Sequence, residues 1–189
     1  MLETTFIPFP ELYTDRLILR KLLLSDAPAI LRLRGDDTVM KYIDRDKAAT
    51  LADAETFINR IQNSLETNQG ITWAIAHKDT PAELIGTIGF WRMIREHYRA
   101  EIGYMLDPRQ WKKGIMKEAI LKVVDTGFST LLLHSIEAHV NPDNVGSASL
   151  LLSVGFVKEA HLKEAFYYNG TFRDTVIYSK LNDQTPATL

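Results

Sequence analysis

The sequence predicts an α/β protein with one mixed, mainly antiparallel sheet of about seven strands and with helices on both faces of that sheet. Strand-like runs follow one another through short connections between residues 71 and 106, which is typical of an antiparallel meander. A strand–helix–strand–helix order follows between residues 99 and 155. Two further strand-like runs around Asn169-Gly170 indicate a terminal hairpin, because this pair supplies the positive φ angles of a tight turn.

The first third of the chain is predicted to begin with a strand and a helix. Residues 16–22 alternate apolar and basic side chains in the manner of a strand. Ser25 is expected to cap a helix over residues 26–34. Pro28 is compatible with this helix because it falls in the first turn.

A second, amphipathic helix is predicted over residues 51–69. Thr50 and Asp53 stand at the spacing of a capping box, and apolar side chains recur behind them at helical intervals. Gly70 is placed to end this helix. The strands of the meander are then expected over residues 71–78, 84–94 and 99–106.

The second half of the chain is predicted to alternate helices and strands. A helix that starts near residue 114 is expected to bury one face, formed by Ile120, Val123, Val124, Gly127 and Phe128. A strand at 135–140 and a short helix within 144–155, closed by Gly155, come next. The terminal hairpin is expected within residues 163–181.

The composition limits the classes of function. With 189 residues, 46% hydrophobic and 24% charged, the chain is expected to be a single domain over residues 1–189. Its net charge of -2 provides no broad basic surface, so neither nucleic acid nor a membrane is expected as a partner. The absence of cysteine excludes disulfides, thiolate metal sites and a cysteine nucleophile. No signal peptide and no long apolar segment is visible, so a cytoplasmic location is expected.

The loop at residues 108–119, PRQWKKGIMKEA, predicts an anion site. It leads from a strand into a helix, where free backbone N–H groups and the helix dipole favour negative charge. Gly114 allows the backbone to approach an anion closely, and Lys112 and Lys113 add positive charge. The GxxxxGK[ST] pattern is missing, so nucleotide hydrolysis is not predicted. On the loop alone, the alternative is a plain turn with solvated lysines.

The segments on either side of this loop favour the anion site over a plain turn. In order and spacing, EIGYML, WKKGIMKEA and IEAHVNPDNVGSASLLLSVGF resemble the GNAT superfamily of acyl-CoA-dependent N-acetyltransferases, in particular the branch with the ribosomal-protein N-terminal acetyltransferases. The resemblance covers about residues 12–181. It implies the acyl-CoA N-acyltransferase fold, in which two central strands part to leave a V-shaped opening for acetyl-CoA.

The resemblance also implies how the cosubstrate is held. Pantetheine would pair with the backbone near Met105 and Leu106, and the loop would wrap the pyrophosphate. The family commonly writes this loop Q/R-x-x-G-x-G/A. The matching positions here are Trp111, Lys112, Lys113, Gly114, Ile115 and Met116. Trp111 and Met116 depart from the pattern, which affects side-chain contacts more than a cradle of backbone N–H groups.

Acetyl transfer to an amine requires a neutral amine and a proton for the departing thiolate. The resemblance places Glu101 on the central strand beside the acetyl group, as a catalytic base or relay. The alternative is a surface glutamate, and Glu137 and a water chain are the other candidates for the base. With no cysteine, direct attack in a ternary complex is the simplest scheme.

Asn144 and Ser147 form the second group of candidate residues. Three positions apart on the first turn of a helix, they share one face, although Asn144 would also be an ordinary helix cap. In the resembling family the asparagine contacts the pantetheine arm or the substrate, and the serine lies near the coenzyme sulfur as a proton donor. Both are therefore expected in the catalytic and the cosubstrate-binding sets.

Other residues carry weaker predictions. The five histidines show no metal-ligand spacing, so no metal is expected. Tyr167 and Tyr168 are expected to wall a substrate cleft or to pair across strands. The acceptor is expected to be a peptide N-terminus or a small-molecule amine, and the protein a monomer or homodimer. Two alternatives are a non-catalytic acyl-CoA sensor on the same scaffold and a dinucleotide-binding enzyme, which is disfavoured because no GxGxxG follows a strand.

Overall fold

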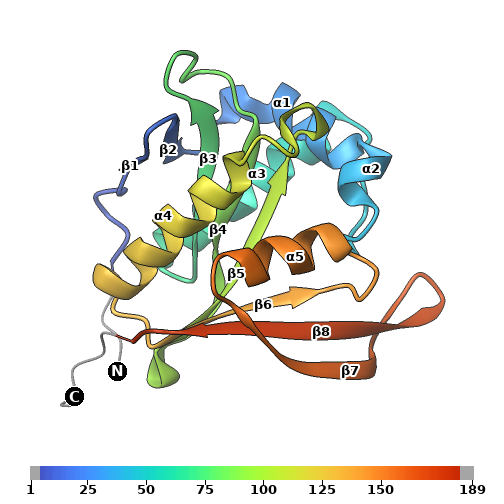
Figure 1. Ribbon diagram of the computed structural model, residues 1–189. Helices are drawn as coiled ribbons and strands as arrows, with labels where there is room; N and C mark the ends of the chain where they lie inside the picture. Colours follow the sequence, from blue (N-terminus) through green and yellow to red (C-terminus); the bar gives the residue numbers. More distant parts are fainter. Residues whose placement is uncertain (1–4, 184–189) are drawn as a thin grey trace.

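The computed structural model describes residues 5–183 and shows one eight-stranded sheet with helices on both faces (Figure 1). The strand order is β1-β2-β3-β4-β5-β6-β8-β7. The strands are β1 (Leu12–Tyr13), β2 (Leu17–Lys21), β3 (Ile71–His77), β4 (Gly86–Ile94), β5 (Arg99–Leu106), β6 (Ser135–Val140), β7 (Val157–Tyr168) and β8 (Thr171–Leu181). The α-helices are α1 (Ala27–Gly35), α2 (Asp37–Met40), α3 (Leu51–Glu66), α4 (Ile115–Ser129) and α5 (Val145–Ser153).

The predicted α/β class and mainly antiparallel sheet are confirmed, with eight strands in place of about seven. The additional strand is β1, which has only two residues and no room for an alternating pattern. The short helix α2 was also missed. The hairpin turn is confirmed, since Asn169 and Gly170 have φ angles of 46° and 78°. The hairpin itself is longer than expected, because β7 begins at Val157.

Two predicted helix ends were wrong. Ser25 does not cap α1, because it lies inside the 3-10 turn Leu24–Asp26, and Asp26 is the residue that precedes the helix. Helix α3 has the predicted capping box but ends at Glu66, short of Gly70. Gly70 has a different role: a Cβ there would lie 2.6 Å from the carbonyl oxygen of Phe90, so the residue allows two backbone segments to approach.

The sheet opens between β5 and β6. All neighbouring strands are antiparallel except these two, which run parallel and pair at only three positions, the last being Glu101 with Glu137. Beyond this pair the strands diverge, as Figure 1 shows. We call this opening the splay. It is the feature that the resemblance implied as a V-shaped gap.

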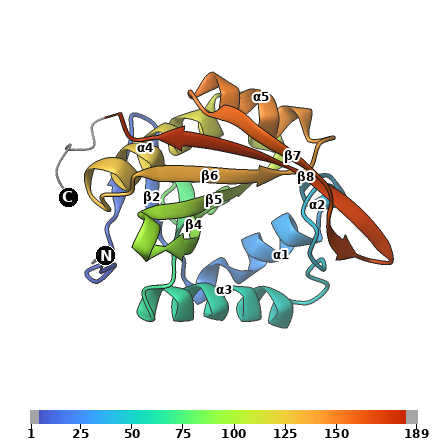
Figure 2. The ribbon, with the colours of Figure 1, turned by 90° about the horizontal axis from the view of Figure 1, so that it is seen from below.

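The two faces of the sheet carry separate apolar clusters (Figure 2). Helices α4 and α5 cover one face, where Ile102 of β5 packs in a cluster with Ile120 and Leu151. Helices α1 and α3 cover the other, where Met105 of β5 packs with Ile30 and Ile58. Because side chains alternate along a strand, Glu101 shares the α1/α3 face with Met105. Within the described residues, no helix is long and apolar enough to cross a bilayer.

Candidate functional site

The open edge of β5 offers backbone groups to a ligand in the splay. The amide of Asp107 donates to the carbonyl oxygen of Ile85 (2.8 Å), which continues the β4–β5 ladder by one pair. Hydrogen-bonded pairs recur at every second position, so odd-numbered residues of β5 bond to β4. The N–H and C=O groups of Tyr104 and Leu106 therefore point toward the splay, whereas those of Met105 point toward β4.

The loop before α4 forms a cradle of backbone N–H groups. Gly114 precedes the helix with φ +75° and has no side chain to cap it. The amide of Glu118 makes the first bond of the helix, to the carbonyl oxygen of Gly114 (3.1 Å), so the amides of the three residues between them have no acceptor within the helix. Lys112 also has a positive φ of 60°, an uncommon conformation for a residue with a side chain. The arrangement fits a phosphate group.

A polar brace holds this cradle against the start of β2. The guanidinium of Arg16 donates to the carbonyl oxygen of Lys113 (3.0 Å) and to the carboxylate of Glu118 (2.7 Å). Thr14 donates a hydroxyl hydrogen bond to the same carboxylate (2.5 Å). Burial alone would raise the pKa of Glu118, but the hydrogen bonds from Thr14 and Arg16 outweigh it and lower the pKa. Glu118 is therefore a charged anchor at neutral pH.

Trp111 fixes the loop from the other side. Its indole nitrogen donates to the carbonyl oxygen of Leu106 (2.8 Å), and its side chain is 41% exposed. This bond occupies one of the outward-pointing groups of β5. Lys112 and Lys113 are exposed, whereas Ile115 and Met116 bury their side chains in the core. The last two residues can therefore contribute to a ligand only through their backbone.

Glu101 is a buried carboxylate beside the splay. Its side chain is 4% exposed and accepts a hydrogen bond from Arg92 (3.1 Å). Burial raises the pKa of Glu101, the charges of His139 and Arg92 lower it, and that of Glu137 raises it again, with a net upward shift. A carboxylate with a raised pKa is a stronger base than a solvated one.

Arg92 reaches Glu101 because β4 is irregular. The pairing of β4 with β5 slips between Trp91 and Ile94, and Arg92 takes a φ of +47°. Such a bulge redirects a side chain. The guanidinium also stacks 4.6 Å above the ring of Trp91. The bulge therefore supplies the partner of Glu101, and no alternating pattern in the sequence indicated it.

Glu137 and His139 face the same side as Glu101. The carboxylate of Glu137 accepts hydrogen bonds from Arg99 and lies 3.3 Å from the Nε2 atom of His139. One side-chain donor atom from each of Glu101, Glu137 and His139 lies within 4.8 Å of the others, a spacing at which a metal ion could be held. Arg92 and Arg99 already compensate the two carboxylates. The absence of a metal stays a prediction.

Ser147 lies on the opposite face of β5. Its hydroxyl is 2.8 Å from that of Tyr104, and burial raises the pKa of Tyr104 to about 12. Tyr104 is therefore protonated at neutral pH and can donate to Ser147, which leaves the Ser147 proton free for another acceptor. The Oδ1 atom of Asn144 accepts the amide of Ser147 (3.1 Å), so Asn144 does cap α5.

The sequence therefore indicated part of this arrangement. Glu101 and Glu137, both candidate bases, are brought together on one face of the sheet, and the loop and Ser147 lie around the splay. Tyr104 was missed as a functional residue. Its place in EIGYML, three positions after Glu101, puts its side chain on the opposite face of the strand. His139 was also missed; its position two residues after Glu137 on a strand is the signal that would have placed it on the same face.

The hairpin β7–β8 contacts the helical layer on the α2 side of the sheet. Tyr168, near its tip, donates a hydrogen bond to the carboxylate of Asp46 in the α2–α3 loop (3.3 Å). Tyr167 packs edge-to-face on Phe172, with ring centroids 5.2 Å apart. Of the two predicted roles, Tyr167 takes the cross-strand pair and Tyr168 reaches the helical layer. Figure 2 shows the hairpin extending past the sheet toward α2.

Comparison with known proteins extends over most of the chain. The sequence pattern of the acetyltransferase (GNAT) domain matches residues 16–157, a span that contains the cradle, Glu101 and Ser147. An uncharacterized N-acetyltransferase of Bacillus subtilis strain 168, YoaA, is 44% identical over 171 residues, which are 90% of this chain and 96% of the relative.

Solved structures agree with the sequence matches. A ribosomal-protein-S5-alanine acetyltransferase from Vibrio fischeri has a TM-score of 0.81 at 26% identity and covers 94% of this chain and 99% of its own. Spermidine N-acetyltransferase from Vibrio cholerae, in complex with CoA and spermine, has a TM-score of 0.78 at 26% identity, with coverages of 89% and 97%. By its domain pattern, its relatives and its fold, the chain belongs to the GNAT family of N-acetyltransferases.

Proposed function

We propose that this protein transfers the acetyl group of acetyl-CoA to a primary amine by direct attack within a ternary complex. The observation that carries the proposal is the position of Glu101 on one face of β5 and of the Tyr104–Ser147 pair on the other, beside the splay. Transfer from a thioester to an amine removes one proton from the amine and supplies one to the sulfur. The two faces hold one group suited to each task.

Acetyl-CoA would be held largely by the backbone. The free amides of the first turn of α4, which include those of Ile115 and Met116, would contact the pyrophosphate together with the amide of Gly114, and Lys112 and Lys113 would add positive charge nearby. The outward-pointing groups of Tyr104 and the N–H group of Leu106, whose carbonyl oxygen already accepts from Trp111, would pair with the pantetheine arm. The thioester would then lie beside α5, within reach of Ser147. The cosubstrate supplies the activated acyl group, and the residues of the chain orient it.

The protons would move through named residues. Glu101 takes a proton from the attacking amine, directly or through a water, while a C–N bond forms and the C–S bond breaks. Ser147 gives its proton to the departing sulfur, and Tyr104 supports the serine oxygen with its own hydrogen bond. The amine proton remains on Glu101 until solvent removes it, and solvent returns a proton to Ser147. The products are an amide and a free thiol.

The acceptor amine would be a peptide N-terminus or a small-molecule amine. The names of relatives include a spermidine acetyltransferase and ribosomal-protein acetyltransferases, so both kinds of amine occur among them. We further propose that the chain acts as a single catalytic domain, as a monomer or homodimer in the cytoplasm.

Two measurements test this function. Coenzyme A at millimolar concentration should raise the melting temperature, because a ligand that prefers the native state stabilises it. Acetyl-CoA should release free thiol only when an acceptor amine from a broad panel is present. No thermal shift would contradict cosubstrate binding. Binding without thiol release on any amine would indicate an acyl-CoA sensor, and acetylation of the protein itself without acceptor would contradict direct transfer.

A further inference from the structure

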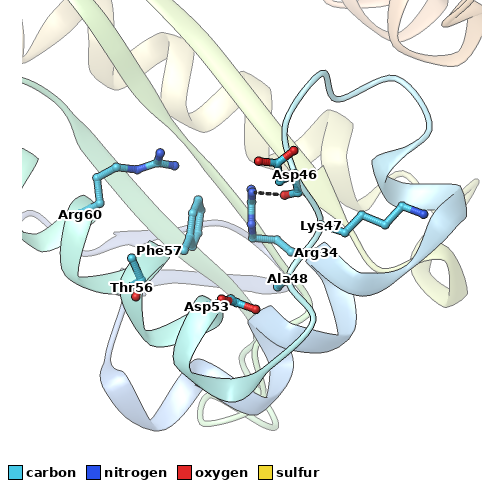
Figure 3. A pocket seen from close by; sticks show the side chains of 8 residues that line it. All are labelled: Arg34, Asp46, Lys47, Ala48, Asp53, Thr56, Phe57 and Arg60. Atoms are coloured by element: carbon cyan, nitrogen blue, oxygen red, sulfur yellow. Dashed lines mark hydrogen bonds between the residues drawn. The ribbon is translucent and has the colours of Figure 1, made fainter. Parts of the chain in front are cut away.

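A pocket of about 220 Å³ lies between α1, the α2–α3 loop and α3, away from the acetyl-transfer residues. Arg34, Phe57 and Arg60 line it from the two helices, and Asp46 and Ala48 line it from the loop. Figure 3 shows the side chains of Arg34, Phe57 and Arg60 side by side, with the ring of Phe57 between the two arginines. The guanidinium carbons of Arg34 and Arg60 lie 4.5 Å and 5.5 Å from the ring centroid.

Two of the three positive side chains that line this pocket, Arg34 and Arg60, have no ion pair among the described residues, whereas the third, Lys47, pairs with Asp37. Within residues 5–183, Arg34, Arg45 and Arg60 form no ion pair with a carboxylate. Arg34 and Arg45 donate to backbone carbonyl oxygens of the loop instead, at 3.1 Å and 2.9 Å. Burial, followed by the charges of Arg60 and Arg45, lowers the pKa of Arg34. Like charges gathered in a pocket raise the free energy of the empty state, and a bound anion would relieve this cost.

The acidic residues of the pocket are engaged elsewhere. The carboxylate of Asp53 accepts the amides of Ala49 (2.9 Å) and Thr50 (2.8 Å), as the cap of α3. That of Asp46 accepts the hydroxyl of Tyr168 from the hairpin. The pocket thus keeps its acidic groups in structural hydrogen bonds and presents guanidinium groups, which bind carboxylates and phosphates in a planar, two-pronged manner.

The pocket lies on the face of the sheet from which the amine would approach. Phe57 packs against the apolar cluster that contains Met105, and Glu101 is four residues before Met105 on the same face of β5. The pocket and Glu101 therefore border the same face of the sheet, where one extended peptide could contact both.

We propose that this arginine pocket binds an acidic side chain of a peptide acceptor whose N-terminal amine lies at Glu101. The inference rests on the proposed acetyltransferase function and narrows its acceptor class. A polyamine would bring further positive charge to the two lining arginines, which have no ion pair in the described part of the chain, and this is electrostatically unfavourable. The preferred acceptor is an acidic peptide, with its carboxylate at one preferred number of positions from the free amine.

A peptide series tests the position of the charge. Six-residue peptides with a common N-terminal serine and an otherwise neutral sequence would carry one Glu at each position from the second to the sixth, each with a matched Gln peptide. Thiol release gives kcat/KM. We expect the Glu peptide to exceed its Gln partner about tenfold at the best position, the scale of a charge-assisted hydrogen bond. A phosphoserine at that position should also be favoured, because the guanidinium groups bind both anions.

Variants assign the effect to the pocket. Arg34→Gln and Arg60→Gln should each lower the Glu-to-Gln ratio toward one. Arg60 is exposed, so its variant keeps the test valid if the Arg34 variant does not fold. Lys122→Gln removes one positive charge from α4, on the opposite face of the sheet, and should keep the wild-type ratio. A ratio that is unchanged in both arginine variants would overturn the proposal.

The outcomes separate this inference from the proposed function. Acetylation of peptides with a Glu-to-Gln ratio near one at every position would overturn the pocket and leave the acetyltransferase intact. Efficient acetylation of spermidine with no acidic peptide preferred would do the same. If no amine is acetylated, the proposed acetyltransferase function is contradicted. Fluorescence anisotropy with a labelled Glu peptide then tests separately whether the pocket binds an acidic peptide. Binding of the labelled peptide that is weakened in Arg60→Gln would support it, and no binding would overturn it.

Discussion

The two ends of the site are built in different ways. At the proposed coenzyme end, the loop before α4 offers N–H groups that come from one continuous segment, with Gly114 at its turn. At the proposed acceptor end, Glu101 and Glu137 lie on neighbouring strands and the arginine pocket comes from two helices and a loop. A backbone site depends on local conformation and tolerates side-chain changes. A side-chain site depends on tertiary placement, so single residues there should control rate and choice of acceptor.

The largest effect is expected from a change of backbone at the coenzyme end. Gly114→Pro removes an N–H donor and forces φ from +75° to the negative value of the proline ring. Thermal stabilisation by coenzyme A should disappear. Gly114→Ala is the matched control: it keeps the N–H group, and although its Cβ is strained at this positive φ and lies 3.4 Å from Arg16, more of the stabilisation by coenzyme A should remain than in Gly114→Pro. Equal stabilisation of wild type and the proline variant would contradict a backbone cradle.

The next largest effect is expected at Glu101. Glu101→Gln keeps the shape of the side chain and its contact with Arg92 but removes the base, so kcat should fall by roughly 10² or more while coenzyme A still binds. The loss should shrink as pH rises, because the amine then loses its proton without help. The pH profile of thiol release measures this. Wild-type turnover in the variant at neutral pH would transfer the role to Glu137 or a water chain.

A somewhat smaller loss is expected at Ser147. Ser147→Ala removes the proton donor to the thiolate, for which a loss of up to about 10² in kcat is reasonable. Unlike the loss in Glu101→Gln, this one should persist or grow at high pH, because alkali does not replace an acid. Tyr104→Phe leaves the serine in place and should lose less. Recovery of Ser147→Ala at high pH would show that the serine is not the donor.

A few-fold effect is expected from the lysines of the loop. Lys112→Gln and Lys113→Gln each remove an exposed charge and leave the N–H groups unchanged. The KM for acetyl-CoA should rise by about threefold in each, and by less at high ionic strength, where exposed charges are screened. If either lysine variant lost coenzyme A binding as completely as Gly114→Pro, side chains and not the backbone would hold the pyrophosphate. The contrast between a backbone site and a side-chain site would then be wrong.

The smallest effect concerns stability. The pKa of Glu101 is raised in the native state, mainly by burial, so the native protein holds its proton more tightly than the unfolded chain does. Its contribution to stability is therefore lost as pH rises from the unfolded pKa of about 4.3 through the higher native value. Glu101→Gln should melt at a higher temperature than wild type at pH 8, with the difference shrinking toward pH 4. A constant difference would contradict a titrating Glu101.

Features built from neighbouring residues could be predicted from the sequence, and features built from distant residues could not. Strands with clear alternation, the capping box of Thr50 and Asp53 and the cradle at Gly114 depend on neighbouring residues, and they were predicted. The link between Arg92 and Glu101 depends on a bulge, and that between Tyr168 and Asp46 joins segments 122 positions apart. No local pattern encodes such contacts. Ser25 failed as a cap because a 3-10 turn competed for the same residues.

The placement of Glu101 and Ser147 on opposite faces of β5 has a consequence for each catalytic cycle. In the proposed mechanism, one side of the sheet would hold an extra proton after transfer and the other side would lack one, so the net charge would be unchanged but a dipole would form across the strand. Solvent would have to discharge this dipole before the next turnover. The cycle would therefore include a proton-exchange step with solvent. When that step limits the rate, turnover should slow in D₂O and respond to buffer concentration.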